Sequence, residues 1–365
     1  MVTLLTPVML EAFRSRAAGY DKDNAFFAED LDDLRAAGYL VPRGLLETAK
    51  DQRLLAAYAP ATALGINMHL VWTGVARVLS ERGDHSLDWV LADAAAGELF
   101  AFGNSEQGND LVLWDSLTTA ETVDGGYAFT GTKIFTSLSP AWTRLGIFGR
   151  HGDELVHGFI TRDTPGWHSK DDWDTLGMRA TQSQSTVLDG AIVPTERIAR
   201  ILPVGPSADP FIFGIFSNFL LLIGSVYAGI ADRALELAVE AVKRRTSLRT
   251  GSSYAQDPDF RWRIADAALA LDAIAPQLES LASDVDRLAD HGAAWFRLLT
   301  GAKHRATETA RYVVDQAMRS AGGGGYSATG ELARLQRDVL AGIYHPSDTE
   351  SVHNTVATNL LGPAE

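Results

Sequence analysis

The chain has 365 residues, of which 46% are hydrophobic and 21% charged, as is usual for a folded globular protein of about two to three domains. Acidic residues outnumber basic ones by 46 to 32, and the net charge of −14 repels phosphate backbones, which argues against a nucleic-acid partner. The absence of cysteine excludes disulfides, thiolate nucleophiles and zinc–thiolate sites, and it favours a reducing, cytoplasmic location.

The N-terminal part of the chain has the periodicity of helices. Apolar residues recur at helical spacing in the stretches 29–37, 50–58, 65–81 and 88–96. We therefore expect an all-α domain over residues 1–96.

Between residues 97 and 204 the pattern changes to short runs that are rich in β-branched and aromatic residues. Turn signals, such as Asp124-Gly125-Gly126, separate these runs. The sequence therefore predicts a β domain over residues 97–204, with strands at 118–123, 127–135, 144–149 and 154–161.

Helical periodicity returns in the last part of the chain, residues 205–365. Long helices are expected over 213–245, 258–289 and 292–320. Four consecutive glycines at 322–325 end the third helix, and a last helical pair follows. Helices, a β domain and helices again predict an α+β chain with a helical bundle around a central sheet domain.

One stretch, residues 211–231, is long enough to span a bilayer because it contains no charge. Ser217, Asn218 and Ser225 interrupt it, and it continues into an amphipathic stretch that ends at Arg245. We interpret it as a buried helix of the bundle rather than a membrane span. The first ten residues lack the basic start and the apolar core of a secretion signal, so we expect no membrane or secretory targeting.

Several motifs resemble those of the acyl-CoA dehydrogenase superfamily. Phe-Gly-Asn-Ser-Glu-Gln-Gly-Asn-Asp at 102–110 resembles its flavin loop, and residues 124–137 resemble its Asp-Gly-x-Tyr strand pair. Leu-Gly-Met-Arg-Ala-Thr-Gln-Ser at 176–183 with Asp-Gly-Ala-Ile-Val-Pro at 189–194 resembles the end of its β domain. Ile-Ala-Asp-Arg-Ala-Leu-Glu-Leu-Ala at 230–238 resembles the start of its C-terminal bundle.

The end of the chain continues the same resemblance. Ala-Gly-Gly-Gly-Gly-Tyr at 321–326, Arg-Asp at 337–338 and Ile-Tyr-His-Pro at 343–346 resemble the family's Gly-Gly-x-Gly, Arg-Asp and Ile-Tyr-Glu-Gly motifs. Each motif is weak alone, and their shared order is what carries the resemblance. It implies an N-terminal helical domain, a middle β-barrel-like domain and a C-terminal four-helix bundle, assembled as a homotetramer or homodimer with bound FAD or FMN.

The resemblance places four residues at the flavin. Ser105 falls where the family has a donor to the pyrimidine edge, and Asn109 falls where a short polar side chain meets the phosphate. Phe135 falls at the aromatic position against the ring, and Ser137 at the hydroxyl near N5. The alternative is that Ser105 and Asn109 cap their own turn and that Phe135 is a core residue of a strand.

Two further features resemble the family's contacts with a cofactor in a neighbouring subunit. Gly323 and Gly324 fall where backbone approaches that cofactor, and Arg244 falls where an arginine reaches a diphosphate. Ser247 and Leu248 replace the Phe-Gly that follows this arginine in the family, which weakens the match. A helix C-cap for the glycines and a dipole contact for the arginine are equally good explanations.

The family's catalytic base has no counterpart here. A dehydrogenase of this family removes an α-proton with a carboxylate, but His345 stands near the position of that glutamate. The other position used by the family aligns with Phe219, and no acidic residue lies between Asp209 and Asp232. Thioester dehydrogenation is therefore disfavoured.

The ending resembles better the two-component flavin monooxygenases of the superfamily, which take reduced flavin from a separate reductase. The resemblance assigns His345 and Ser137 as the catalytic pair, because imidazole and hydroxyl donors can stabilise a flavin–oxygen adduct. The alternative for His345 is a loop or helix-start residue without chemistry, which the following Pro346 makes plausible.

His69, Trp72, Phe102 and Tyr344 are candidates for the substrate pocket, although histidines and aromatics at such positions are as often core residues. Trp142 is a weaker candidate. No metal-ligand spacing is present, so we predict no metal site.

Three functions compete on these observations. The first is a flavin-dependent monooxygenase that acts on a small organic substrate. The second is a dehydrogenase of an acyl-CoA or acyl-carrier-protein thioester with a base elsewhere. The third is a scaffold that kept the fold without catalysis.

Overall fold

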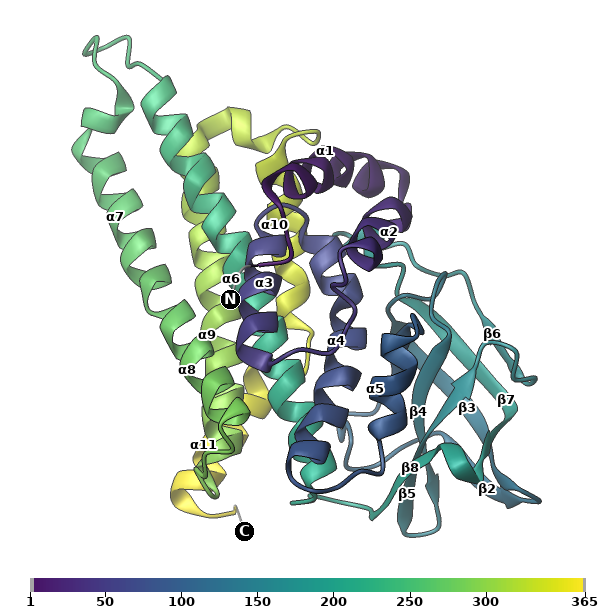
Figure 1. Ribbon diagram of the computed structural model, residues 1–365. Helices are drawn as coiled ribbons and strands as arrows, with labels where there is room; N and C mark the ends of the chain where they lie inside the picture. Colours follow the sequence, from purple (N-terminus) through teal and green to yellow (C-terminus); the bar gives the residue numbers. More distant parts are fainter. Residues whose placement is uncertain (1–2, 364–365) are drawn as a thin grey trace.

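The computed structural model describes residues 3–363, and it confirms the α+β class with helices before and after a sheet (Figure 1). Thr6 caps the first helix by accepting a hydrogen bond from the Met9 N–H, and prolines start the first and fourth helices. The N-terminal helices are α1 (Pro7–Asp23), α2 (Ala28–Ala36), α3 (Leu45–Ala56), α4 (Pro60–Glu81) and α5 (Asp88–Ala95).

The middle part is one eight-stranded sheet, and β6 and β8 lie at the two ends of its strand order β6-β7-β3-β2-β4-β5-β8. β1 pairs in parallel with β4, whereas the β2–β3, β3–β7, β4–β5, β5–β8 and β6–β7 pairs are antiparallel. The strands are β1 (Phe100–Gly103), β2 (Thr119–Val123), β3 (Gly126–Thr136), β4 (Arg144–His151), β5 (Glu154–Thr161), β6 (Trp167–Ser169), β7 (Gln184–Pro194) and β8 (Ile198–Pro203).

The end of β3 leaves the regular ladder. Its pairing with β7 shifts between Lys133 and Thr136, so the two residues between them have no partner in β7. Ile134 instead donates its N–H to the Ser105 carbonyl at 2.8 Å. This irregularity brings the loop after β1 next to the end of β3.

The C-terminal helices form the bundle. The stretch expected as one helix over 258–289 is two helices, because Pro276 cannot donate an N–H and its ring clashes with the carbonyl of Asp272. The helices are α6 (Pro210–Arg244), α7 (Pro258–Asp272), α8 (Ile274–Asp286), α9 (Ala294–Ala321), α10 (Glu331–Leu340) and α11 (Thr349–Leu361), with 3-10 turns η4 (Gly322–Tyr326) and η5 (Ala341–Ile343).

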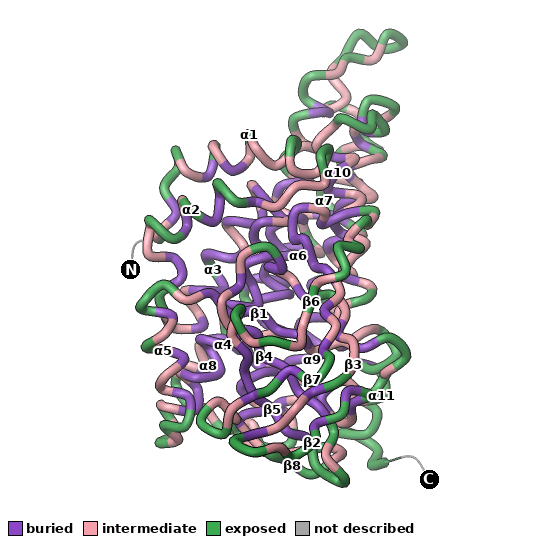
Figure 2. The backbone as a smooth tube through the Cα atoms, turned by 90° about the vertical axis from the view of Figure 1, so that its right-hand side faces the viewer, coloured by how far each residue is buried: buried purple, intermediate pink, exposed green. Residues whose placement is uncertain are grey.

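Helix α6 runs through the centre of the molecule, and Figure 2 shows it mainly buried. Within residues 3–363 it is the one helix long and apolar enough to cross a membrane, but most of that apolar window is covered by protein. Glycines let neighbouring helices approach it closely. A Cβ on Gly229 would lie 2.1 Å from the Arg53 carbonyl of α3, and one on Gly74 of α4 would lie 2.0 Å from Asn218. The helix is therefore a core helix, as the sequence predicts.

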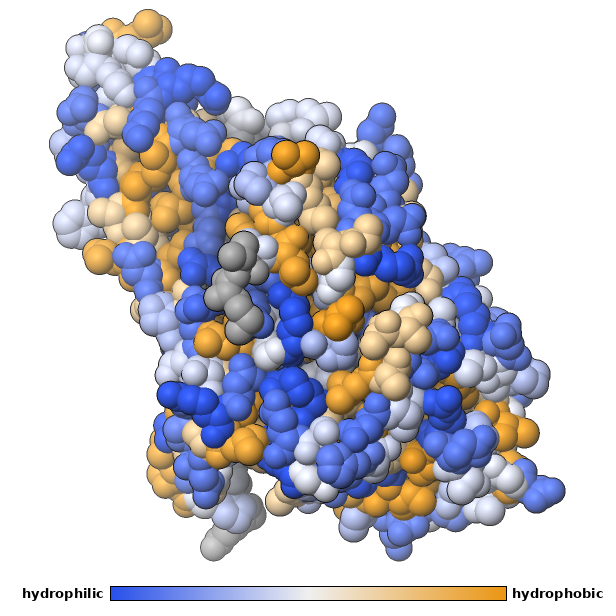
Figure 3. Space-filling view, viewed as in Figure 1, coloured by the Kyte–Doolittle hydropathy of each residue, from blue (hydrophilic) through white to orange (hydrophobic). Residues whose placement is uncertain are grey.

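The outer helix α7 carries large apolar side chains on its surface. Trp262 is 77% exposed and Leu269 is 71% exposed. Figure 3 shows hydrophobic groups among polar ones over this end of the molecule. A surface of this kind is suited to contact another protein surface.

Candidate functional site

Backbone strain is concentrated where β3 ends. Phe135 and Leu138 have φ of 58° and 67°, and Met178 and Gln182 have φ of 54° and 43°, although none of them is glycine. The two segments touch, since the Leu138 N–H donates to the Thr181 carbonyl at 3.3 Å. Strained backbone of this kind gathers at functional sites, so this contact is where we place the candidate site.

A chain of hydroxyl groups crosses the same contact. The Oγ atoms of Ser137 and Ser183 lie 2.8 Å apart, and Ser183 Oγ lies 2.8 Å from Thr181 Oγ1. Thr181 Oγ1 in turn donates to the Met178 carbonyl at 2.9 Å. Ser137 is half-buried, and its hydroxyl is positioned by the contact with Ser183.

Phe135 presents an apolar ring to the surface. It is 54% exposed, so the core role considered from the sequence does not apply. Its ring lies edge-on to Trp173, with centroids 6.1 Å apart. An exposed aromatic ring next to Ser137 suits packing against a flat ligand.

A buried ion pair, which the sequence reasoning missed, anchors the loop after β1 to β3. Lys133 Nζ lies 2.7 Å from Glu106 Oε1, and both side chains are almost fully buried. The same carboxylate accepts hydrogen bonds from Ser116 Oγ and from the N–H groups of Leu117 and Thr118. Despite burial, the Lys133 ammonium and these donors hold the pKa of Glu106 at about 2. Both residues lie inside the motifs at 102–110 and 124–137, so their opposite charges were the sequence signal from which this ion pair could have been predicted.

Asn109 serves this anchored loop. Its side-chain amide donates to Glu106 Oε2 at 2.8 Å and to the Asp115 carbonyl at 2.9 Å, and its oxygen accepts from the Leu111 N–H. Both amide protons are therefore used within the loop, and the turn role weighed from the sequence describes the residue better than a phosphate contact. Ser105, by contrast, lies half-buried beside Ile134 at the end of β3.

The strained turn is joined to the C-terminal bundle. The Met178 N–H donates to Asp338 Oδ1 of α10 at 2.6 Å, and Arg337 Nε donates to the Leu176 carbonyl at 3.0 Å. Gly177 allows this approach, since a Cβ there would lie 2.4 Å from the Arg337 backbone. Burial raises the pKa of Asp338 to about 6, although the Met178 N–H opposes the shift. The Arg-Asp motif thus holds the sheet domain to α10.

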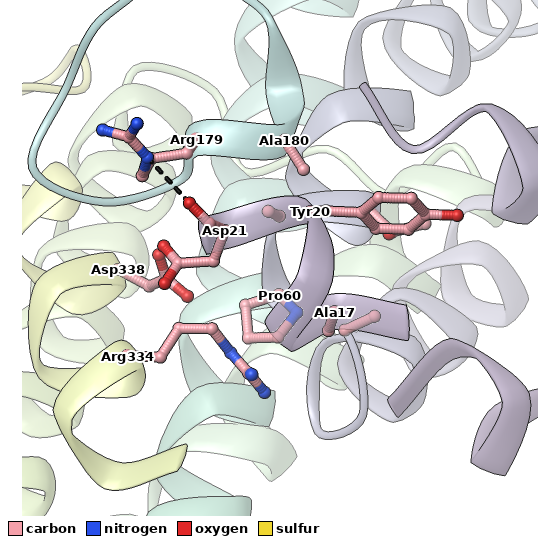
Figure 4. A pocket seen from close by; sticks show the side chains of 11 residues that line it. Ala17, Tyr20, Asp21, Pro60, Arg179, Ala180, Arg334 and Asp338 are labelled. Carbon is pink, nitrogen blue, oxygen red and sulfur yellow. Dashed lines mark hydrogen bonds between the residues drawn. The ribbon is translucent and has the colours of Figure 1, made fainter. Parts of the chain in front are cut away.

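A small cleft lies beside this junction (Figure 4). Arg179 Nε donates to the Asp21 carbonyl at 2.8 Å across it, while Arg334 and Asp338 of α10 face it from the other side. None of the site residues predicted from the sequence lines this cleft. We therefore treat it as part of the domain junction and not as the substrate pocket.

His345 lies in the loop between η5 and α11. Its Nδ1 atom is 2.9 Å from the Tyr227 hydroxyl of α6, and its carbonyl accepts a hydrogen bond from Lys303 Nζ of α9 at 2.7 Å. Burial and the Lys303 ammonium lower the pKa of His345 to about 3. The imidazole is therefore neutral at physiological pH, whereas the sequence argument started from its ordinary pKa near 6.5. Ser137 and His345 make no direct hydrogen bond in the described part of the chain.

The candidates for the substrate pocket separate into two groups. His69, Trp72 and Phe102 are core residues, at most 4% exposed, and Tyr344 is 77% exposed next to His345. His69 Nε2 lies 2.8 Å from the Leu40 carbonyl and its Nδ1 accepts the Phe100 N–H, so both ring nitrogens are used.

Trp72 is held in the same way, because its Nε1–H donates to the Ala101 carbonyl at 3.0 Å. Trp142 is also buried in the core. We therefore retain only Tyr344 as a pocket candidate, since burial leaves the others no access to a substrate.

The two features expected at a partner's cofactor lie at the surface. Gly323 and Gly324 are exposed in η4, and a Cβ on either would meet no described atom within 4 Å. Arg244 is also exposed. Its neighbour Arg245 donates instead to the Ser320 carbonyl at 2.9 Å and so holds the end of α9. In residues 3–363 no group of three metal-ligating side chains is found.

The sequence is similar to a known protein family and to several characterised proteins. Residues 221–347 match the acyl-CoA dehydrogenase C-terminal domain family. The putative acyl-CoA dehydrogenase YdbM of Bacillus subtilis is 27% identical over 95% of this chain and 93% of its own length. The amino sugar nitrososynthase DnmZ of Streptomyces peucetius is 30% identical over 61% of this chain and 56% of its own length. The dibenzothiophene monooxygenase of Rhodococcus qingshengii is 26% identical over 64% of this chain and 60% of its own length.

Solved structures match over nearly the whole chain. KijD3 in complex with FMN and a dTDP-linked sugar is 25% identical, with a TM-score of 0.83 over 99% of this chain and 94% of its own. Butyryl-CoA dehydrogenase of Megasphaera elsdenii is 19% identical, with a TM-score of 0.84 over 99% of this chain and 100% of its own. The fold predicted from the motifs is confirmed by these matches.

Proposed function

Because residues 221–347 match the acyl-CoA dehydrogenase C-terminal domain family and related structures match over nearly the whole chain, we propose that the protein is a monooxygenase of the acyl-CoA dehydrogenase superfamily. It would use reduced FMN or FAD and O2 to oxidise a small organic substrate. The observation that carries the proposal is the loss of the carboxylate base. The sequence resemblance puts His345 near one of the family's two positions for it and Phe219 of α6 at about the other. Neither side chain is an anion at physiological pH.

The residues at the end of β3 fit a flavin ring. The exposed Phe135 suits packing against a flat heterocycle, and the hydroxyl of the half-buried Ser137 suits a hydrogen bond at its edge. Ser105, brought alongside by its pairing with Ile134, is suited to the neighbouring edge. When bound, reduced flavin supplies the electrons that activate O2.

His345 suits the role of a neutral hydrogen-bond donor. A carboxylate at this place would repel an anionic reduced flavin, whereas a neutral imidazole donates without adding charge. Its partly buried position and the Lys303 ammonium both keep the ring uncharged. We assign it to oxygen or substrate activation and not to abstraction of an α-proton.

The rest of the proposal concerns partners and location. We propose a separate reductase as the source of reduced flavin, a homotetramer or homodimer as the assembly, and the cytoplasm as the compartment. The exposed Trp262 and Leu269 of α7 and the open Gly323 and Gly324 of η4 support the assembly. A monodisperse monomer that still binds flavin tightly would refute it.

Thioester dehydrogenation is the second candidate, favoured by the match to YdbM over almost the whole chain. It requires a base that the described residues do not supply at either family position. Asp338, a buried carboxylate near Tyr227, is already hydrogen-bonded to the Met178 N–H.

The deciding experiment follows the absorbance of protein mixed with FMN or FAD. We expect flavin reduced by a reductase and NADH to reoxidise more slowly on the protein than in free solution. His345→Ala should remove this delay and release more peroxide, and His345→Glu should not restore it. Ser137→Ala should weaken flavin binding by about 0.5–1.5 kcal/mol, the net value of one hydrogen bond.

Two outcomes would overturn the proposal. Anaerobic bleaching of bound oxidised flavin by an acyl-CoA, abolished in His345→Ala, would establish the dehydrogenase. A colourless protein that binds neither oxidised nor reduced flavin would indicate a scaffold without catalysis.

A further inference from the structure

The hydroxyl of Tyr227 is buried in the core of the bundle with a single hydrogen-bond partner. Tyr227 is fully buried in α6, and His345 Nδ1 is the one group within hydrogen-bonding distance of its oxygen in residues 3–363. Burial, together with the nearby Asp338 carboxylate, raises the pKa of Tyr227 well above its usual value. The hydroxyl therefore keeps its proton.

This proton determines which ring nitrogen of His345 carries hydrogen. If Nδ1 were protonated, it would donate to the tyrosine oxygen, and the hydroxyl proton would be left buried without an acceptor. If the hydroxyl donates to Nδ1, both groups are satisfied. In the neutral imidazole, the hydrogen then lies on Nε2, which makes no hydrogen bond within the described chain.

The loop that carries His345 is held against Tyr227 by hydrogen bonds to its backbone. Lys303 Nζ donates to the carbonyls of Gly342, His345 and Ser347 at 3.2, 2.7 and 2.9 Å. Gly342 lies directly against the tyrosine ring, because a Cβ there would be 3.1 Å from it. The position of the imidazole is therefore fixed from α9 through its backbone and from α6 through Nδ1.

We propose that Tyr227 is a positioning residue that fixes His345 as the Nε2–H tautomer, so that Nε2–H is left free as a hydrogen-bond donor. The chemical use of that donor rests on the proposed function. The tautomer itself does not, since it follows from the contact of Nδ1 with the Tyr227 hydroxyl.

The test is ¹⁵N solid-state NMR of protein labelled only at histidine Nδ1. The chain has nine histidines, and the signal of His345 is assigned by its loss in His345→Gln. We expect an unprotonated Nδ1 whose shift reports an accepted hydrogen bond. In Tyr227→Phe this signal should move to the position of an unbonded or partly protonated nitrogen.

The chain offers matched controls for this experiment. His69 Nδ1 accepts the Phe100 N–H, so it should give an unprotonated signal in every variant. Tyr39→Phe removes another buried hydroxyl, which is bonded to Gln52, and it should leave the His345 signal unchanged. In the flavin reoxidation assay, Tyr227→Phe should shift peroxide release towards that of His345→Ala, with flavin affinity unchanged.

A protonated His345 Nδ1 in the wild-type protein would overturn the inference, even if Tyr227→Phe did not fold. An unchanged Nδ1 signal in a folded Tyr227→Phe would also overturn it. If the NMR result holds but reduced flavin reoxidises no more slowly on the protein than in free solution, the proposed function fails and the tautomer assignment stands.

Discussion

Lys303 of α9 donates a hydrogen bond to the main-chain oxygen of His345 at 2.7 Å, although the lysine side chain is only 1% exposed. Burial lowers the pKa of Lys303 to about 8, and the nearby carboxylate of Asp348 acts in the opposite direction. A buried ammonium that bonds three carbonyl oxygens replaces the hydration it has lost. The lysine thus holds the segment between η5 and α11 in place.

Lys303→Met keeps the length of the side chain and removes its three hydrogen bonds. We expect the free energy of unfolding to fall by about 2–4 kcal/mol, because buried carbonyls lose their donor. Urea denaturation followed by circular dichroism measures this change. Lys243→Met, at an exposed position of α6, should alter the value by less than about 0.5 kcal/mol. Equal effects of the two substitutions would contradict the role assigned to Lys303.

Gly177→Ala should loosen the junction between the sheet domain and α10. The added Cβ would lie 2.4 Å from the Arg337 backbone, which cannot move aside as a flexible side chain can. We expect a loss of about 1–3 kcal/mol in unfolding free energy, the usual range for overpacking. Hydrogen exchange should also show a less protected Met178 amide, because its bond to Asp338 depends on this approach.

Gly323→Ala is the matched control for this substitution. Its Cβ would meet no described atom within 4 Å, so we expect stability close to that of the wild type. If Gly177→Ala is as stable as Gly323→Ala, the close approach to α10 has no energetic importance.

Glu106→Gln should be strongly destabilising because it leaves the buried Lys133 ammonium without its counter-ion. The expected loss is about 3–5 kcal/mol. The double variant Glu106→Gln with Lys133→Met should recover part of this loss, since no buried charge remains. A double variant less stable than the single one would show that the pair does not act through charge.

The same carboxylate gives a pH dependence with a definite sign. The pKa of Glu106 is lowered to about 2 in the folded protein, below its value in the unfolded chain. Its contribution to stability is therefore fully present above about pH 4.5 and is lost as the pH falls towards 2. The unfolding free energy of Glu106→Gln, measured over this window, should lack this part of the slope.

The sequence predicted the order of helical and β regions and the central helix because both follow from the hydrophobic periodicity. Residues 211–231 have no charge and lie inside α6. The motifs also located Ser137 and Phe135, which the structure places together at the end of β3. β7 was missed, because its serine, threonine and glutamine residues obscure the alternation of a strand.

The contacts that depend on tertiary structure could not be predicted. Tyr227 lies inside an apolar helix 118 positions from His345, and no periodicity links them. Lys303 resembles any charged residue of an amphipathic helix until the loop at 342–347 folds over it. His69 and Trp72 were ambiguous for the same reason, since only packing separates a core residue from a pocket residue.

His157 is a buried histidine for which the proposed reaction has no use. Its ring stacks on Phe148, with centroids 5.0 Å apart, and within residues 3–363 neither ring nitrogen has a hydrogen-bond partner. Burial, together with the charges of Lys133 and Arg200, lowers its pKa to about 3. The unfolded chain therefore binds a proton near pH 6.5 that the folded protein does not bind.

We expect His157→Phe to stabilise the protein, and most strongly in acid. Near pH 7.5 the gain should be about 1–2 kcal/mol, because two unpaired polar atoms leave the core. As the pH falls from about 6 to 4, the unfolding free energy of the wild type should fall by up to about 1.4 kcal/mol per pH unit more than that of the variant. The reason is that His157 binds a proton in the unfolded wild type but not in the folded one. Urea titrations across this range measure both effects.

His168→Gln, at an exposed histidine, should follow the wild-type slope. Parallel curves for the wild type and His157→Phe would mean that His157 takes up its proton without unfolding.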